Sequence, residues 1–344
     1  MIKNIKISRR NFIKNSAVGL GTAGIGISKS NELFGNEKSL SNQIIQREKI
    51  SPREVWVLSV SKERIEGNNS EKITKDMIER MNIMASYKPD IICLPEVFAT
   101  SVKTAETIPG PIIETFISYA KEHNCYIICP IHTKKSNKVY NSAVLIDRKG
   151  NIVGQYDKIH PTENECDNKV TPGNSPPPVF KTDFGTIGIL ICFDINWIEE
   201  WKSLKEQGAE IVFWTAAFPG GRMLSSYAWF FQYYVVGCSL RDPILIYDVT
   251  GDLIFESGIY EHWAFCPLNL EKIFCEIDYH TGKVRDIRKK YGRKVGIRYL
   301  HNEDWVILES CSPDLPIKQI VDEYGLVSHW DYIKRAEKYQ KKFR

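Results

Sequence analysis

Short apolar runs that alternate with longer amphipathic stretches are the feature that most constrains the fold of this chain. The runs are rich in β-branched and aromatic residues, as in EVWVLSV, PDIICLPE and TIGILICFD, and turn residues bound them. Runs of this length and composition indicate buried strands rather than helices. Buried strands joined by helices are typical of the α/β class. Hairpin spacings between some runs indicate that the sheets are mixed.

The same patterns predict where the elements lie. Strands are expected over residues 54–60, 89–96, 125–132, 140–147, 151–159, 186–194, 210–218 and 272–279. Helices are expected over residues 70–87, 112–124 and 195–208. Residues 225–238 are expected to form a helix or another mostly buried segment, and residues 243–257 a hairpin that turns at Thr250 and Gly251. The chain should end in a cationic helix.

Composition divides the chain into four segments. We expect a leader over residues 1–30, a linker over 31–52 and a folded domain over 53–285. Residues 286–344 form a C-terminal extension, which is expected to pack on the domain or at a subunit interface.

The leader carries the basic character of the chain. It holds six cations and no acid: Lys3, Lys6, Arg9, Arg10, Lys14 and Lys29. The remaining 40 of 46 Lys and Arg face 42 Asp and Glu, which excludes a nucleic-acid footprint. The arginine pair followed by a Gly-rich apolar run resembles a twin-arginine export signal. That resemblance implies a precursor that uses the twin-arginine export machinery and a periplasmic or other extracytoplasmic location. A disordered basic tail or an uncleaved anchor is the alternative.

The cysteines do not form a disulfide framework. There are nine, an odd number, and most lie in apolar segments. No CxxC occurs and no Cys/His cluster has zinc spacing, so no metal site is expected.

Three polar, reactive residues follow apolar strands. Glu96 follows IICLP, Lys158 follows VGQYD and Cys192 follows GILI. In α/β folds the ends of strands collect function, because a rigid sheet holds the reactive groups while loops shape the pocket. Each residue alone could be a helix cap, a surface charge or a small core side chain. Their combination and order is the informative signal.

In this order the motifs resemble the nitrilase superfamily of carbon–nitrogen hydrolases. The matching text is LPEVF, YDKIHPT and GILICFDINWIEE, with Pro172–Gly173, GAEIVFW and the hairpin near Asp248 to Ser257. The likeness runs from about Glu54 to about Asp278. It implies a four-layer α-β-β-α sandwich, assembled as a homodimer or larger homo-oligomer, and a reaction that needs no metal or organic cofactor.

The resemblance also implies roles for the site residues. Cys192 is the expected nucleophile and Glu96 the general base. Lys158 is expected to lower the thiol pKa and, with the backbone N–H of Phe193, to stabilise an oxyanion. A second glutamate, Glu165 with Glu163 as the fallback, is expected to position Lys158 or share proton transfer.

Several other residues near these motifs have two possible roles. Trp214, Thr215 and Ala216 are candidate substrate-lining residues, although a core role fits them equally well. His160 could pair with Cys192, a weaker alternative, and Glu199 matches the acidic position that follows the family cysteine. The dense aromatics between Tyr227 and Tyr234 are expected in the core or at a subunit interface.

The expected activity is hydrolysis of a small-molecule amide or N-carbamoyl amide, with water, through a cysteine thioester. The alternatives are a nitrilase that converts a nitrile to a carboxylate, and a non-catalytic binding protein that retains the fold. A thiol redox protein ranks last because no resolving cysteine is evident.

Overall fold

The structure is a computed structural model of the chain, and it describes residues 49–258 and 260–344. The expected leader, residues 1–30, and most of the expected linker, 31–52, lie outside these residues. The strands are β1 (Glu54–Val60), β2 (Ile91–Cys93), β3 (Tyr126–Lys135), β4 (Lys138–Ile146), β5 (Ile152–Asp157), β6 (Val179–Lys181), β7 (Thr186–Ile191), β8 (Ile211–Ala216), β9 (Tyr234–Ser239), β10 (Leu245–Tyr247), β11 (Leu253–Glu256), β12 (Trp263–Asn269), β13 (Lys272–Glu276), β14 (Val295–Leu300) and β15 (Trp305–Ser310). The α-helices are α2 (Ser70–Asn82), α3 (Pro111–His123), α4 (Glu163–Asp167), α5 (Ile198–Glu206), α6 (Arg222–Phe231), α7 (Ile277–Tyr291), α8 (Ile317–Tyr324) and α9 (His329–Gln340).

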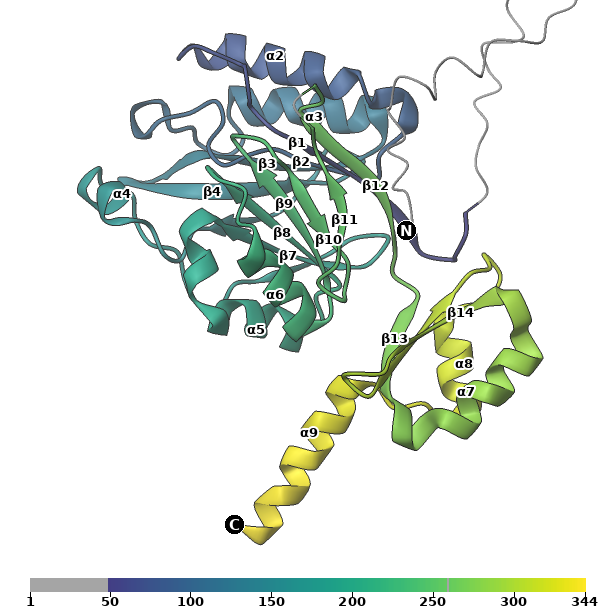
Figure 1. Cartoon of the computed structure of the whole chain (residues 1–344). Helices are drawn as coiled ribbons and strands as arrows, with labels where there is room; N and C mark the ends of the chain where they lie inside the picture. The colour runs from purple at the N-terminus through teal and green to yellow at the C-terminus, as the bar shows by residue number, and fades with distance from the viewer. Residues whose placement is uncertain (1–48, 259) are drawn as a thin grey trace, which may run out of the picture. The chain divides into compact units, whose positions relative to one another are not determined.

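Two six-stranded sheets form the centre of the fold (Figure 1). Their orders are β12-β1-β2-β3-β4-β5 and β11-β10-β9-β8-β7-β6. In each sheet three neighbouring strands are parallel, and the strands beyond them pair antiparallel. Helices α2 and α3 flank the first sheet, and α5 and α6 flank the second. The expected α/β sandwich with mixed sheets is confirmed.

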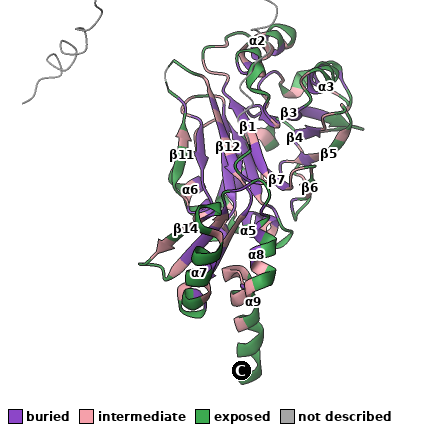
Figure 2. Cartoon of the chain, turned by 90° about the vertical axis from the view of Figure 1, so that its right-hand side faces the viewer, coloured by how far each residue is buried: buried purple, intermediate pink, exposed green. Residues whose placement is uncertain are grey.

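Strand alternation assigns side chains to the two faces of the first sheet. Val55 and Val57 belong to the core between the sheets, whereas Leu58 and Val60 pack towards the helices. Successive side chains of a strand point to opposite faces, so both faces must be apolar when both are covered. Figure 2 shows these strands as the buried centre of the structure.

The segment over residues 225–238 is not one helix. Helix α6 ends at Phe231, and β9 begins at Tyr234 as a buried strand between β8 and β10. Gln232 caps the helix in the left-handed conformation, with φ of 51°. The aromatic run continues from the helix into the strand, and this conceals the change of element in the sequence. After Gln232 the aromatic and β-branched residues favour a strand.

The C-terminal part forms a third sheet that the sequence patterns did not predict. Its strand order is β13-β15-β14, and β14 and β15 pair antiparallel. The strand expected over 272–279 is longer than the observed strand, since β13 ends at Glu276 and α7 begins at Ile277. Residue 286, where the extension was expected to begin, lies inside α7. Helix α9 is the expected cationic helix, and it has no buried residue (Figure 2).

None of the helices in the described part of the chain is both long and apolar enough to cross a membrane. All nine cysteines are free in the structure. The expected homo-oligomer stays a prediction.

Gly173 packs closely against the backbone next to Lys158, so a larger residue at this position should destabilise the protein. Its backbone N–H donates to the carbonyl of Lys158 at 2.8 Å. A Cβ at this position would lie 2.1 Å from the carbonyl oxygen of Asp157, a backbone atom that cannot rotate away. We expect Gly173→Ala to lower the free energy of unfolding by about 1–3 kcal/mol, measured by chemical denaturation. Gly282→Ala is the control, because nothing lies within 4 Å of its Cβ and alanine favours its helix. Equal stability of the two variants would contradict this packing.

Candidate active site

Cys192 lies at a sharp bend between a strand and a turn. Strand β7 ends at Ile191, and a 3₁₀ turn over Cys192–Asn196 begins at the cysteine itself. Cys192 has φ of 47°, a left-handed conformation that non-glycine residues adopt at a cost and that recurs at functional sites. The indole N–H of Trp214 donates to the carbonyl of Cys192 at 3.1 Å and supports the bend. The expected strand over 186–194 therefore ends before its last three residues.

Asp194 connects this bend by hydrogen bonds to the loop that carries Lys158. Its Oδ2 accepts from the Ile191 N–H at 2.9 Å and from the Tyr156 hydroxyl at 2.7 Å. Its Oδ1 accepts from the His160 N–H at 2.9 Å. Burial raises the pKa of Asp194 to about 6, although these three donors lower it. One buried carboxyl thus fixes the positions of two segments that are far apart in sequence.

Lys158 lies between two glutamates. Its Nζ is 3.0 Å from Glu96 Oε1 and 2.7 Å from Glu165 Oε2. Lys158 is 1 % exposed and Glu96 is 5 % exposed, so this pairing is inside the protein. Burial lowers the pKa of Lys158. Glu96, Cys192 and Glu165 together raise it by more than burial lowers it, so the net shift is upward. The lysine therefore stays charged, because the carboxylates compensate its desolvation.

The structure places Glu165, not Glu163, at Lys158. Thr162 and Glu165 form a capping box at the start of α4, in which Glu165 Oε2 accepts from the Thr162 N–H at 2.8 Å. Burial raises the pKa of Glu165, but Lys158 and the hydrogen bonds outweigh it, and the net shift is downward. Glu163 is exposed on the same short helix. Every oxygen of Glu165 accepts a hydrogen bond, which favours positioning Lys158 over proton transfer.

Asn141 was not anticipated. It is 1 % exposed, and its Nδ2 donates to Glu96 Oε1 and to Glu165 Oε1, both at 2.8 Å. Asn141 lies within β4, and not at the end of a strand, so the strand-end pattern does not single it out. The available signal is an asparagine, followed by a serine, at the head of the apolar run AVLI.

The Cys192 thiol is neutral in this arrangement. Burial raises its pKa, the charge of Glu96 raises it further, and Lys158 with the Ala217 N–H lowers it, to a net value of about 12. Lys158 therefore acts in the expected direction but does not outweigh the other effects. The effect of Glu96 on the pKa of Cys192 places its carboxylate near the thiol. A carboxylate that can take the thiol proton is therefore part of the site.

His160 does not pair with Cys192. Its ring stacks on Trp197 with 3.8 Å between ring centroids, and its Nε2 is 3.2 Å from Glu200 Oε1. Glu200 is buried and also accepts from the Ser175 hydroxyl at 3.0 Å, whereas Glu199 is exposed. The inward-facing acid of this segment is therefore Glu200 rather than Glu199.

The remaining candidate residues are Phe193, which directly follows the cysteine, and three residues of β8, the strand that pairs with β7. Phe193 is the second residue of the 3₁₀ turn, where a backbone N–H has no acceptor within the turn. Trp214, Thr215 and Ala216 have no exposed surface, and the Thr215 hydroxyl donates to the Leu94 carbonyl at 3.1 Å. Trp214 and Thr215 thus support the segments that carry Cys192 and Glu96. Their role in lining a substrate stays a prediction.

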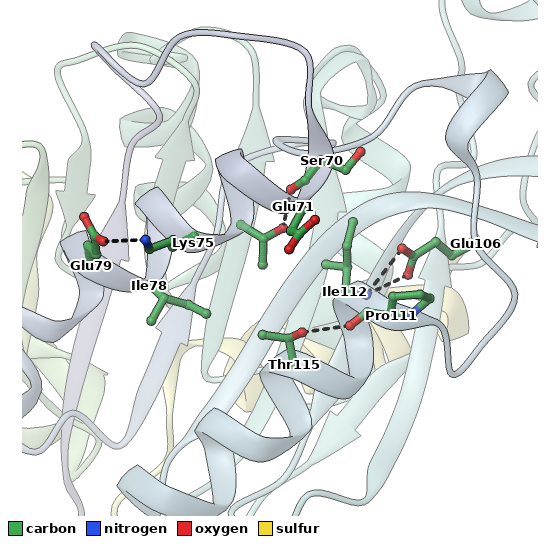
Figure 3. Close-up of a pocket in the computed structure, with 10 residues that line it drawn as sticks. Ser70, Glu71, Lys75, Ile78, Glu79, Glu106, Pro111, Ile112 and Thr115 are labelled. Carbon is green, nitrogen blue, oxygen red and sulfur yellow. Dashed lines mark hydrogen bonds and ion pairs between the residues drawn. The ribbon is translucent and has the colours of Figure 1, made fainter.

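Figure 3 shows a cavity of about 510 Å³ between α2 and α3, with Ile78, Ile112 and Thr115 in its lining. Glu96, Lys158 and Cys192 do not line it, so it is separate from this site. In the described part of the chain, no group of three His, Cys, Asp or Glu side chains could hold a metal ion.

The depressed pKa of Glu165 predicts a pH-dependent contribution to stability. A carboxyl whose pKa is lowered on folding stabilises the protein above its unfolded pKa, about 4.5, and loses that effect as pH falls through the folded value. We expect Glu165→Gln to be less stable than the wild type at pH 7. The difference in melting temperature should narrow as pH falls below about 4.5. A difference that stays constant over this range would contradict the ionised pairing with Lys158.

The sequence of the chain is similar to that of curated proteins over part of its length. The chain is 27% identical over 169 residues to nitrilase homolog 2 of Dictyostelium discoideum, covering 44% of this chain and 51% of that protein. It is 29% identical over 168 residues to deaminated glutathione amidase of the same organism, covering 42% and 57%. The chain thus spans about half the length of the curated relatives it matches.

The fold resembles a solved variant of an amidase from Nesterenkonia in complex with butyramide. The TM-score is 0.56 at 13% identity, with 70% of this chain and 98% of that chain covered. The family model for carbon–nitrogen hydrolases matches residues 56–242, more than half of the chain and a span that contains Glu96, Lys158, Glu165 and Cys192. The protein therefore belongs to the carbon–nitrogen hydrolase family.

Proposed function

We propose that the protein hydrolyses a carboxamide or an N-carbamoyl amide through a thioester on Cys192. The observation that carries this proposal is the buried pair of Lys158 and Glu96, 3.0 Å apart, whose charges both act on the pKa of the Cys192 thiol. Two relatives support an amide as substrate. One is named deaminated glutathione amidase, and the Nesterenkonia amidase variant is in complex with butyramide.

In the first step the thiol attacks the carbonyl carbon while its proton moves to Glu96. Ionising a thiol of pKa about 12 at pH 7 on its own would cost roughly 7 kcal/mol. Proton transfer is therefore coupled to formation of the C–S bond. Since Asn141 and Lys158 occupy Glu96 Oε1, the proton moves to Oε2. The total charge of the side chains and the substrate is unchanged, because the negative charge lost by Glu96 appears on the carbonyl oxygen of the substrate.

Two donors stabilise the oxyanion of the tetrahedral intermediate. The ammonium of Lys158 offers its remaining N–H, and the backbone N–H of Phe193 offers another. Each preorganised donor of this kind contributes on the order of 3 kcal/mol to the barrier. Glu165 and Asn141 do not meet the substrate in this scheme and hold Lys158 and Glu96 in place.

The intermediate collapses as the C–N bond breaks and Glu96 returns its proton to the leaving nitrogen. Ammonia or an amine departs and leaves the thioester. Glu96 then takes a proton from water as the water oxygen attacks the thioester carbon. The C–S bond breaks, the proton returns to sulfur, and the carboxylic acid is released.

Removing the sulfur tests this function. The purified chain is assayed against a panel of amides, N-carbamoyl amides and nitriles, with ammonia quantified and products resolved by mass spectrometry. We expect Cys192→Ala to lower turnover by at least 10³-fold, because no other group can form the thioester.

Cys266→Ala is the matched control for that experiment. Cys266 has the same exposure as Cys192, 9 %, and the same raised pKa of about 12, but burial alone causes the shift. We expect it to retain wild-type turnover. Turnover that survives Cys192→Ala would overturn the proposal, and conversion of nitriles alone to carboxylates would assign the nitrilase alternative.

Export by the twin-arginine route is part of the proposal and rests on the sequence of residues 1–30, with Arg9 and Arg10 at its centre. We expect the full chain to reach the periplasm of a bacterial host, and the double variant Arg9→Lys, Arg10→Lys to stay in the cytoplasm. Cell fractionation with an immunoblot measures this. Unchanged periplasmic delivery of the double variant would contradict the assignment.

A further inference from the structure

The β-ladder places Asn141 beside Lys158. Asn141 lies on β4, directly opposite His132 on β3. The next pair along the β4–β5 ladder is Ser142 with Asp157, and the Lys158 N–H donates to the Asn141 carbonyl at 2.8 Å. Residues opposite each other on neighbouring strands present their side chains on the same face. The sheet therefore fixes the side chain of Asn141 next to that of Lys158.

The amide of Asn141 uses its whole donor capacity on the two glutamates. An amide nitrogen has two N–H groups, and Nδ2 contacts Glu96 Oε1 and Glu165 Oε1, each at 2.8 Å. The carbonyl oxygen Oδ1 is buried and has no hydrogen-bond partner among the described residues. A flipped amide would place that oxygen against two carboxylate oxygens, which repel it. The orientation is thus set by the carboxylates, and the unpaired Oδ1 is its consequence.

These bonds distinguish the two oxygens of Glu96. Oε1 accepts from Asn141 and from Lys158, so both of its lone pairs are engaged. Oε2 makes neither contact, so in the proposed reaction it is the oxygen left to take the proton of Cys192. Asn141 also links Glu96 to Glu165, which would otherwise share only the lysine.

We propose that Asn141 is a positioning residue that commits Glu96 to act as a base through Oε2 alone. The inference rests on the proposed function, because it assigns a role in the same reaction. Asn141 does not contact the substrate. It acts by holding one carboxylate oxygen and by stabilising the charged forms of both glutamates.

The pH dependence of catalysis tests this role. Donors to a carboxylate lower its pKa, so their loss raises it. We expect Asn141→Ala to lower kcat by about 10²-fold with a change in KM below about threefold. The acid limb of kcat/KM should move to higher pH. Asn141→Asp, which adds a third carboxylate of the same shape, should move that limb further in the same direction.

Ser142→Ala is the matched control. Ser142 is the next residue of the strand, is fully buried, and donates to Asp157 Oδ1 at 2.6 Å. A purely structural role for Asn141 predicts that both alanine variants lose stability and that neither moves the acid limb. That result would overturn the proposal, as would a kcat of Asn141→Ala within twofold of the wild type.

A second readout does not depend on turnover. Alkylation by iodoacetamide is followed at each cysteine by peptide mass spectrometry, with the exposed Cys166 and Cys311 as internal references. We expect alkylation of Cys192 to slow in both Asn141 variants and not in Ser142→Ala, while the references are unchanged. Unchanged alkylation of Cys192 would overturn the inference. A wild type that turns over no substrate would instead overturn the proposed function and leave this readout to decide the role of Asn141.

Discussion

The site depends on one buried cation, the ammonium of Lys158. A lysine that is 1 % exposed must be compensated, and Glu96 and Glu165 do so at 3.0 and 2.7 Å. Two carboxylates around one ammonium leave a net charge of −1 beside the thiol. Ionising Cys192 by loss of its proton to solvent would make that charge −2, which accounts for a raised thiol pKa alongside burial. In the proposed reaction, transfer of the proton to Glu96 keeps the charge constant, which would make a buried, neutral thiol usable as a nucleophile.

The two sheets supply the rigidity that this charge balance needs. Glu96 follows a strand of one sheet and Cys192 follows a strand of the other. Bonds between the layers fix their relative position: Thr215 on β8 binds the Leu94 carbonyl, and Asp194 binds Tyr156 of β5. The core between the sheets thus matters for the proposed reaction, because a shift of one sheet against the other would separate Glu96 from Cys192.

The sequence patterns pointed to the candidate reactive residues, which the structure brings together, better than to the residues that hold them in place. Glu96, Lys158 and Cys192 stand out because each is polar and follows an apolar strand. Glu165 could be preferred over Glu163 because Thr162 and Glu165 have capping-box spacing, a local signal. Asn141 had no such signal, since a polar residue inside a strand reads as a solvent-facing position, and only the ladder places it beside Lys158. Strand β9 was hidden in an aromatic run that suits either element, and the β14–β15 hairpin was hidden in basic residues that suggested a tail.

The most direct test of the central claim is the mass of the peptide that contains Cys192, taken from the wild type quenched during turnover of its best amide. We expect the acyl group of the substrate, without its nitrogen, to be attached to Cys192 and to none of the other eight cysteines. A burst of ammonia with no acyl group on Cys192, or with the acyl group on another side chain, would contradict it.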